Sequence, residues 1–270
     1  GSFRTVTDMG GGGPFNLQSG QWTDDTSMAL CLATSLVEKG DFDPRDQMER
    51  YLRWRDEGYL SSIGHCFDIG STVNQALERF RRTGDPLAGS TNPYSAGNGC
   101  IMRLAPIPMF YYSDLQVAEF YAAESSRTTH GALECLDACR LFARIIIRAL
   151  QGRSKKDILL GDRDSFSGSP KILAIARGEY LDKPIEDIRG SGYVVDCLEA
   201  ALWCYQRTST FAEAILLAAN LGEDADTTAA VCGQVAGATY GQSGIPERWL
   251  QLLTMRVEIT RLAEALYTRK

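Results

Sequence analysis

The 270-residue sequence lacks the features that identify several common kinds of protein. Lys and Arg form no cluster long enough to follow a phosphate backbone, and 28 basic against 34 acidic residues leave a net charge of -6. We therefore expect no nucleic-acid partner. No apolar run approaches the ~18 residues that a membrane span needs, and the chain does not open as a signal peptide does.

The sequence also lacks a Cys-x-x-Cys pair, although it has eight cysteines. Most of them stand inside apolar patterns of helical spacing, which favours reduced thiols in a core over disulfides or a metal site. This interpretation predicts a cytoplasmic protein. The eight are Cys31, Cys66, Cys100, Cys135, Cys139, Cys197, Cys204 and Cys232.

No run of period-two alternation stands out, whereas apolar residues recur at helical spacing beyond residue 23. The pattern predicts an all-α fold in one domain that spans residues 1–270. Three irregular stretches, up to about residue 20, 84–98 and 161–170, are the expected places for binding loops. Helices are expected over 24–38, 45–57, 71–83, 99–111, 114–126, 131–151, 194–206, 211–220, 225–240, 247–252 and 254–268.

Two acidic clusters stand at the starts of predicted helices. The first is Thr23-Asp24-Asp25-Thr26, and the second, about two hundred residues later, contains Asp224, Asp226 and Thr227. One acid at a helix start is ordinary, because it accepts backbone N–H groups and offsets the helix dipole. One alternative is therefore that both clusters are independent N-caps, but a single acid would suffice for each.

Carboxylates and hydroxyls are hard oxygen ligands, which Mg²⁺ and Mn²⁺ prefer. If the two helix starts meet in space, their acids would repel one another unless cations lie between them. We therefore expect a site for two divalent cations, Mg²⁺ or Mn²⁺.

The two acidic clusters, together with Gly97-Asn98-Gly99, Met102-Arg103 and Thr129-His130, resemble the ADP-ribosylglycohydrolase family, which includes ADP-ribosylarginine hydrolases. The resemblance extends from Trp22 to Trp249. It implies a single-domain orthogonal helical bundle around a two-metal centre. The family pattern begins with a helix that carries Gly-Asp-Ala-x-Gly and an acidic residue, and no counterpart precedes Gly1, so we expect the domain to lack that helix.

By the resemblance, each cation would have its own ligands. Thr23, Asp24, Asp25 and Asp226 match those of one metal, and Asp224, Asp226 and Thr227 match those of the other.

Further candidates lie outside the two clusters. Asp68 precedes a predicted helix and could be a capping acid; the arginine-specific branch of the family implies that it holds the substrate guanidinium. The stretch Ser95-Ala96-Gly97-Asn98-Gly99 gives backbone N–H groups room to approach a ligand, so Ser95, Gly97, Asn98 and Gly99 could hold a diphosphate. A plain turn before a helix would have the same sequence.

Only two histidines occur. The resemblance puts His130 against the diphosphate or the distal ribose, whereas we interpret His65 as structural. Tyr193 could stack on adenine, although a core or surface tyrosine fits the pattern almost as well.

The resemblance implies hydrolysis of the N-glycosidic bond between ADP-ribose and a modified side chain, and the presence of Asp68 favours arginine as that side chain. Asp25 or Asp226 would take the proton of the attacking water, and Asp68 would face the leaving group. The alternatives are a hydrolase for ADP-ribosylserine or O-acetyl-ADP-ribose, a metal-dependent phosphohydrolase and a non-catalytic ADP-ribose-binding protein. The expected partner is an ADP-ribosylated protein or ADP-ribose itself, and we expect a monomer.

Overall fold

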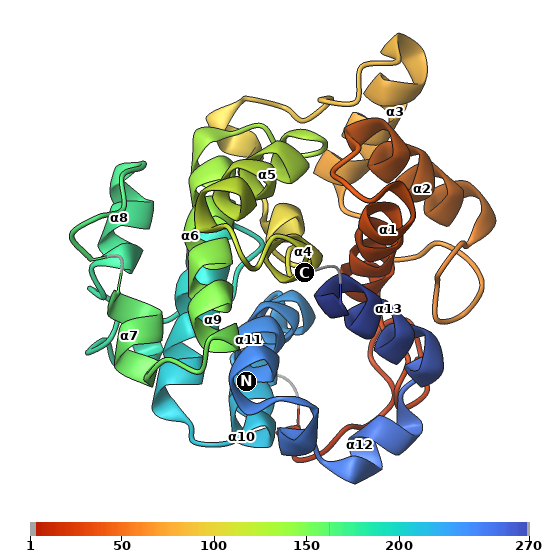
Figure 1. Cartoon of the computed structure of the whole chain (residues 1–270). Helices are drawn as coiled ribbons and strands as arrows, with labels where there is room; N and C mark the ends of the chain where they lie inside the picture. The colour runs from red at the N-terminus through yellow and green to blue at the C-terminus, as the bar shows by residue number, and fades with distance from the viewer. Residues whose placement is uncertain (1–3, 162, 269–270) are drawn as a thin grey trace.

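The computed structural model describes residues 4–161 and 163–268, and α-helices dominate it (Figure 1). Short 3-10 turns lie at Pro93–Ser95 (η1), Asn98–Cys100 (η2), Ile185–Asp187 (η3) and Gln242–Gly244 (η4). The thirteen α-helices in this part of the chain are α1 (Asp24–Lys39), α2 (Pro44–Glu57), α3 (Ser71–Thr83), α4 (Pro106–Phe110), α5 (Leu115–Arg127), α6 (Leu133–Leu150), α7 (Lys155–Leu160), α8 (Pro170–Ala176), α9 (Val194–Arg207), α10 (Phe211–Ala219), α11 (Ala225–Tyr240), α12 (Glu247–Leu252) and α13 (Arg256–Thr268).

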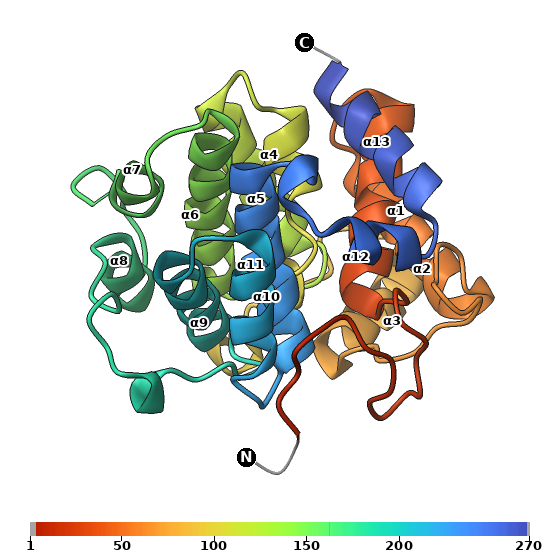
Figure 2. The ribbon, with the colours of Figure 1, turned by 90° about the horizontal axis from the view of Figure 1, so that it is seen from below.

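The helices form two groups that meet at the middle of the molecule. Helices α6, α9 and α11 contact one another, with α5 against α6 and α10 against α11. Helices α2 and α13 pack against α1, and this group lies on the other side of the molecule (Figures 1 and 2). The all-α prediction and the orthogonal bundle are thereby confirmed.

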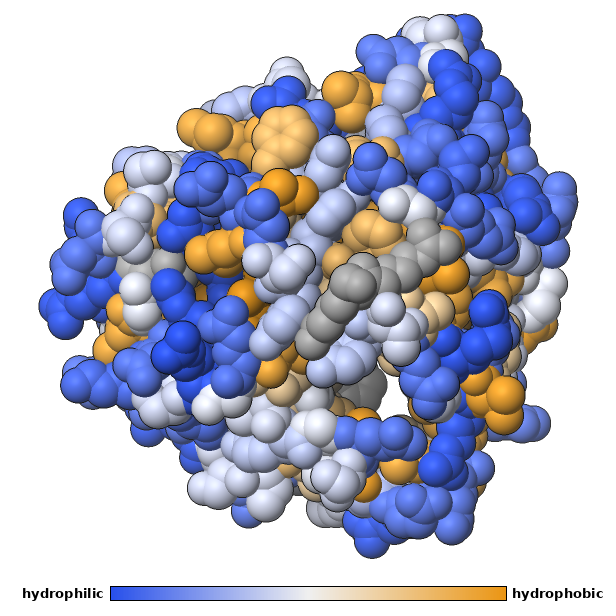
Figure 3. Space-filling view, in the orientation of Figure 1, coloured by the Kyte–Doolittle hydropathy of each residue, from blue (hydrophilic) through white to orange (hydrophobic). Residues whose placement is uncertain are grey.

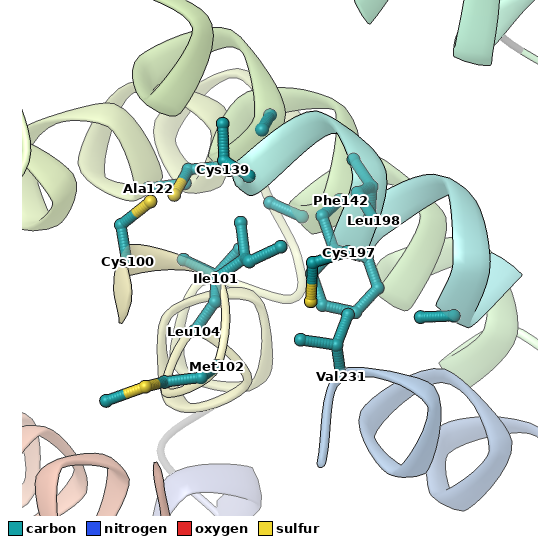
Figure 4. Close-up of a cluster of buried hydrophobic side chains, with 14 of the residues drawn as sticks. Cys100, Ile101, Met102, Leu104, Ala122, Cys139, Phe142, Cys197, Leu198 and Val231 are labelled. Carbon is teal, nitrogen blue, oxygen red and sulfur yellow. The ribbon is translucent and has the colours of Figure 1, made fainter. Parts of the chain in front are cut away.

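One continuous core joins the two groups. Apolar faces of α1, α6, α9 and α11 fill it, as the helical spacing of the sequence predicts. Figure 4 shows part of this core, where Ile101 and Leu104 lie beside Phe142 of α6 and Val231 of α11. Seven of the eight cysteines are buried, so their predicted place in the core is confirmed.

The prediction of one helix over 99–111 is wrong. The turn η2 covers Asn98–Cys100, and only Pro106–Phe110 forms an α-helix. Pro106 sets the start of the α-helix, because proline has no N–H to donate and is favoured at the first helical position. The segment between η2 and α4 instead turns through hydrogen bonds from Ile101 and Met102 N–H to the Asn98 carbonyl.

Two short helices were not predicted. Helices α7 and α8 flank the expected irregular segment 161–170, and each has only six or seven residues. So few residues give little periodicity, and packing against α6 stabilises both instead.

The surface carries many hydrophilic residues, with apolar side chains scattered among them on the face in Figure 3. Of the helices that the structure describes, none combines the length and hydropathy that crossing a membrane requires.

Candidate functional site

The two acidic clusters lie together in the folded chain. Helices α1 and α11, which begin at the clusters, are in contact. The Asp24 carboxyl feels the charges of Asp25, Asp68 and Asp226, and the Asp25 carboxyl feels those of Asp226 and Asp224. Residues two hundred positions apart therefore share one acidic site.

Ordinary helix capping does not explain these clusters. The residues at the N-cap positions of α1 and α11, Thr23 and Asp224, make no side-chain capping hydrogen bond. Elsewhere the chain caps its helices in the usual way: Asp43 accepts two backbone N–H groups at α2, and Asp114 does the same at α5. The alternative that the two clusters are independent N-caps therefore fails, because neither Thr23 nor Asp224 caps its helix.

Burial and mutual repulsion disfavour the charged form of these acids. Burial first, and then the neighbouring Asp226 carboxylate, raise the pKa of Asp25 to about 7. Burial, followed by the charge of Asp25, raises the pKa of Asp24 well above its ordinary value. Partial desolvation and the charges of Asp226 and Asp224 raise the pKa of Asp68 to about 6. Such a site gains stability from any cation that enters it.

The donor set fits a hard divalent cation. Asp25 is 4% exposed, and its Oδ1 is buried without a hydrogen-bond partner, while its Oδ2 accepts a 2.8 Å bond from the Thr23 hydroxyl. An orphaned carboxylate oxygen among other carboxylates is the chemistry that Mg²⁺ or Mn²⁺ satisfies. Across residues 4–161 and 163–268, however, no three His, Cys, Asp or Glu side chains converge tightly enough to hold an ion as they stand.

A cavity of about 290 Å³ opens beside the acids. Asp24, Asp68, Asp224 and Thr227 line it together with the loop Gly97–Gly99 and His130. The tertiary structure therefore brings three of the predicted metal ligands, Asp24, Asp224 and Thr227, to one cavity with Gly97–Gly99, whereas Thr23, Asp25 and Asp226 do not line it.

The loop around Asn98 is held in place from several sides. The Asn98 side-chain amide donates a 2.7 Å hydrogen bond to Asp224 Oδ2, and its backbone N–H donates to the Gly192 carbonyl. The Val194 N–H donates to the Ala96 carbonyl, and the Gly97 N–H donates to the Ser95 carbonyl. The N–H groups of Gly97 and Asn98 are thus used inside the protein, so other groups of this loop would have to contact a ligand.

His130 stands between this loop and the start of α6. Its ring is buried, its Nδ1 lies 2.8 Å from the Thr129 hydroxyl, and burial lowers its pKa to about 4. A Cβ at Gly99 would lie 2.8 Å from the ring's Cε1, and one at Gly97 would lie 3.3 Å from Nε2. A Cβ at position 99 would therefore force the imidazole to shift, whereas a Cβ at position 97 would only be in tight contact with it.

A second cavity, of about 570 Å³, adjoins the first and shares Gly97 with it. Ser95 and Tyr193 line it, and so do Glu134 and Lys171. The Tyr193 hydroxyl donates to the Glu134 carboxylate and accepts a 2.8 Å hydrogen bond from Lys171 Nζ. This arrangement fixes the ring of Tyr193 at the wall of the cavity.

Asp68 is solvent-exposed at the cavity and has a backbone φ of 60°. Aspartate and asparagine tolerate this left-handed conformation better than most residues do. Partial burial and the nearby Asp226 and Asp224 carboxylates raise the pKa of Asp68, so Asp68 lies close to the second acidic cluster.

Sequence reasoning missed several residues of this region as site residues. Arg103 and Thr129 were noticed only as parts of the motifs, although Arg103 stands in an apolar stretch, where a charged residue is a signal of a buried role. Nothing in the sequence marks Glu134 or Lys171.

Comparisons with known proteins identify the family of the chain. A sequence-family model described as ADP-ribosylglycohydrolase matches residues 2–270. The chain is 45% identical over 264 residues to the ADP-ribosylarginine hydrolase Tri1 of Pseudomonas putida (strain GB-1), covering 98% of this chain and 71% of the relative. It is 34% identical over 263 residues to the ADP-ribosyl-[dinitrogen reductase] glycohydrolase of Rhodospirillum rubrum, covering 96% and 83%.

A solved structure, described as an ADP-ribosylglycohydrolase-related protein complex, superposes with a TM-score of 0.86 at 44% identity. The match covers 99% of this chain and 88% of that one. With the family model spanning nearly every residue and relatives above 30% identity, the chain belongs to the ADP-ribosylglycohydrolase family, a family of enzymes.

Proposed function

We propose that this protein hydrolyses the N-glycosidic bond between ADP-ribose and an arginine side chain of a target protein, with the help of two divalent cations. The meeting of the two acidic clusters at one cavity carries the proposal. The names of the relatives at 45% identity, both ADP-ribosylarginine hydrolases, support arginine as the modified residue.

In this proposal Thr23, Asp24, Asp25 and Asp226 hold one cation, and Asp224, Asp226 and Thr227 hold the other. Bound Mg²⁺ or Mn²⁺ would lower the pKa of a water and orient the ribose hydroxyls. The unpartnered Oδ1 of Asp25 supports this assignment, because a buried carboxylate oxygen otherwise has no compensation for its lost hydration.

The chain's own carboxylates would do the remaining chemistry. Asp25 or Asp226 takes the proton of the attacking water, and the negative charges around the anomeric carbon stabilise an oxocarbenium-like transition state. Asp68 faces the leaving group and pairs with the guanidinium. Because the arginine linkage is already cationic, the guanidine leaves as a neutral molecule and needs little help from a general acid.

The ADP-ribose would extend from the acids past Asn98 and His130 towards Tyr193. The two adjoining cavities support this path. Ser95, Gly97 and Gly99 would border the diphosphate, and the fixed ring of Tyr193 offers a surface on which adenine could stack.

The macromolecular partner is then an ADP-ribosylated protein, and the free thiols of the core suit the cytoplasm.

A product assay tests the function. Release of ADP-ribose from ADP-ribosylarginine supports it, AMP would indicate a phosphohydrolase, and binding without turnover would indicate a non-catalytic binding protein. A parallel panel with serine-linked and O-acetyl-linked ADP-ribose determines the linkage. Asp24→Asn and Asp226→Asn should each abolish turnover, and an undiminished rate in either variant would contradict the assigned metal roles.

A further inference from the structure

Arg103 is a buried cation whose hydrogen-bond partners are neutral. Its side chain is 1% exposed, and its guanidinium lies 4.9 Å from the centre of the Tyr51 ring. Nη1 donates a 2.8 Å bond to the Gly99 carbonyl, and Nη2 donates a 2.6 Å bond to the Thr129 hydroxyl. Burial of a charge is costly, so a guanidinium placed here must do more than fill space.

Thr129 connects this guanidinium to His130. The Thr129 side chain is fully buried, and its oxygen lies 2.6 Å from Arg103 Nη2 and 2.8 Å from His130 Nδ1. A guanidinium can only donate, so the hydroxyl accepts from Arg103. If the hydroxyl also accepted from Nδ1, its own proton would need a further acceptor in a buried place. Donation from Thr129 to Nδ1 satisfies all three groups.

This hydrogen-bond order determines where the imidazole proton lies. When Nδ1 is an acceptor in a neutral imidazole, the proton is on Nε2. Burial, with a further contribution from the Arg103 charge, lowers the pKa of His130 to about 4, so the ring is neutral at physiological pH. Nε2 lies on the side of Gly97 and Gly99, and His130 lines the smaller cavity.

We propose that Arg103 and Thr129 are positioning residues that fix His130 as the Nε2–H tautomer, so that its Nε2–H donates to an oxygen of the bound ADP-ribose. The other tautomer would turn a lone pair towards an oxygen-rich ligand and repel it. The same guanidinium also holds the Gly99 carbonyl, so one residue sets both the ring and the loop beside it. The ligand half of this proposal rests on the proposed function; the tautomer half does not.

Nitrogen NMR tests the tautomer directly in the ligand-free protein. Long-range proton–nitrogen correlation spectra distinguish an unprotonated ring nitrogen from a protonated one. The spectra are simple to assign because the chain has only two histidines. His65 is exposed, and a His65→Gln variant assigns its signals. We expect His130 to show a bare Nδ1 and a protonated Nε2 at pH 7. A protonated Nδ1 in the wild-type protein would overturn the proposal.

Two variants at position 129 distinguish the effect of the hydrogen bond from Thr129 to His130 from the effect of simple packing. Thr129→Val keeps the shape but removes the hydroxyl, so His130 should lose its single tautomer and the affinity for ADP-ribose should fall about tenfold, the usual effect of one lost hydrogen bond. Thr129→Ser restores the hydroxyl and should restore both signals. The proposed role of the Thr129 hydroxyl is contradicted if Thr129→Val leaves the tautomer of His130 unchanged, or if Thr129→Ser does not restore the tautomer and the affinity.

The same experiment distinguishes this proposal from the proposed function. If the wild-type protein shows the expected tautomer but does not bind ADP-ribose, the proposed function fails and the positioning of His130 stands. If Thr129→Val does not fold, the wild-type spectrum still decides whether His130 is the Nε2–H tautomer.

Discussion

The Asn98 side-chain amide donates a 2.7 Å hydrogen bond to Asp224 Oδ2, across 126 positions of sequence. This contact joins the loop beside His130 to the second acidic cluster. It also holds a carboxylate that lies among others of the same charge, so it orients Asp224 where repulsion would otherwise move it.

Asn98→Asp should therefore damage the site. The variant replaces a donor by a further negative charge, and we expect kcat/KM for ADP-ribosylarginine to fall about ten- to a hundredfold. Steady-state kinetics at saturating Mg²⁺ measures this. Asn74→Asp is the matched control and should keep the wild-type rate. Asn74 is exposed on α3, and its Oδ1 accepts a 3.3 Å hydrogen bond from Arg55 Nη1. Equal rates for Asn98→Asp and wild type would show that the contact is dispensable.

The metal-free protein should become less stable as the pH rises. The pKa of Asp25 is about 7 in the folded chain against about 4 when unfolded, so the folded state binds more protons between these values. The free energy of unfolding consequently falls from about pH 4 to about pH 7 on account of this group. Thermal melts with chelator at pH 5 to 8 measure the trend, and Asp25→Asn should flatten it. A trend of the opposite sign that Asp25→Asn leaves intact would contradict the raised pKa.

Removal of divalent cations should abolish turnover, and Mg²⁺ or Mn²⁺ should restore it. At a free cation concentration of about one hundred times the dissociation constant, binding adds about 2.7 kcal/mol to the free energy of unfolding. The Tm should therefore rise by roughly 5–10 °C. Asp25→Asn should be more stable than wild type without metal at pH 7.5, because it removes a buried charge, yet it should gain far less from Mg²⁺. Calorimetric melts with and without the ion check both effects, and an equal gain in the variant would exclude Asp25 as a ligand.

Gly99→Ala should disturb His130. The new Cβ would lie 2.8 Å from the ring's Cε1, so the imidazole must shift, at about 1–3 kcal/mol. We expect the affinity for ADP-ribose, measured by titration calorimetry, to fall at least about tenfold. Gly10→Ala has open space around its Cβ and serves as the control. Unchanged affinity in Gly99→Ala would show that the position of the ring does not matter for binding.

Asp68→Asn should affect the linkage that is cleaved more than the binding of ADP-ribose. Asparagine keeps the left-handed backbone at this position, so the change removes the charge without straining the loop. Hydrolysis of ADP-ribosylarginine should fall about ten- to a hundredfold as the guanidinium loses its partner, whereas the affinity for free ADP-ribose should stay within about twofold. Asp187→Asn, on the exposed turn η3, is the control. A loss of affinity equal to the loss of rate would indicate that Asp68 serves the metal centre instead.

The sequence predicts most of the helices because their apolar pattern repeats over several turns and their capping signals are local. It fails where local signals conflict or are short. Within the expected helix 99–111 the α-helix begins only at Pro106, and α7 and α8 contain too few residues to show a period. The residue types in short segments also indicated candidates for the site, because one acid suffices to cap a helix and adjacent acids at a helix start therefore indicate a further role.

By itself the sequence determined the all-α class, the core cysteines and the two acidic clusters, because spacing along a helix and the preferences of side chains are properties of short segments. Only the tertiary structure decided that Asp25 and Asp226 repel each other, that Asn98 holds Asp224, and that Arg103 reaches His130 through Thr129. Those long-range relations join residues that are 26 (Arg103 and Thr129), 126 (Asn98 and Asp224) and 201 (Asp25 and Asp226) positions apart, and the packing of α1, α6 and α11 around one core creates them.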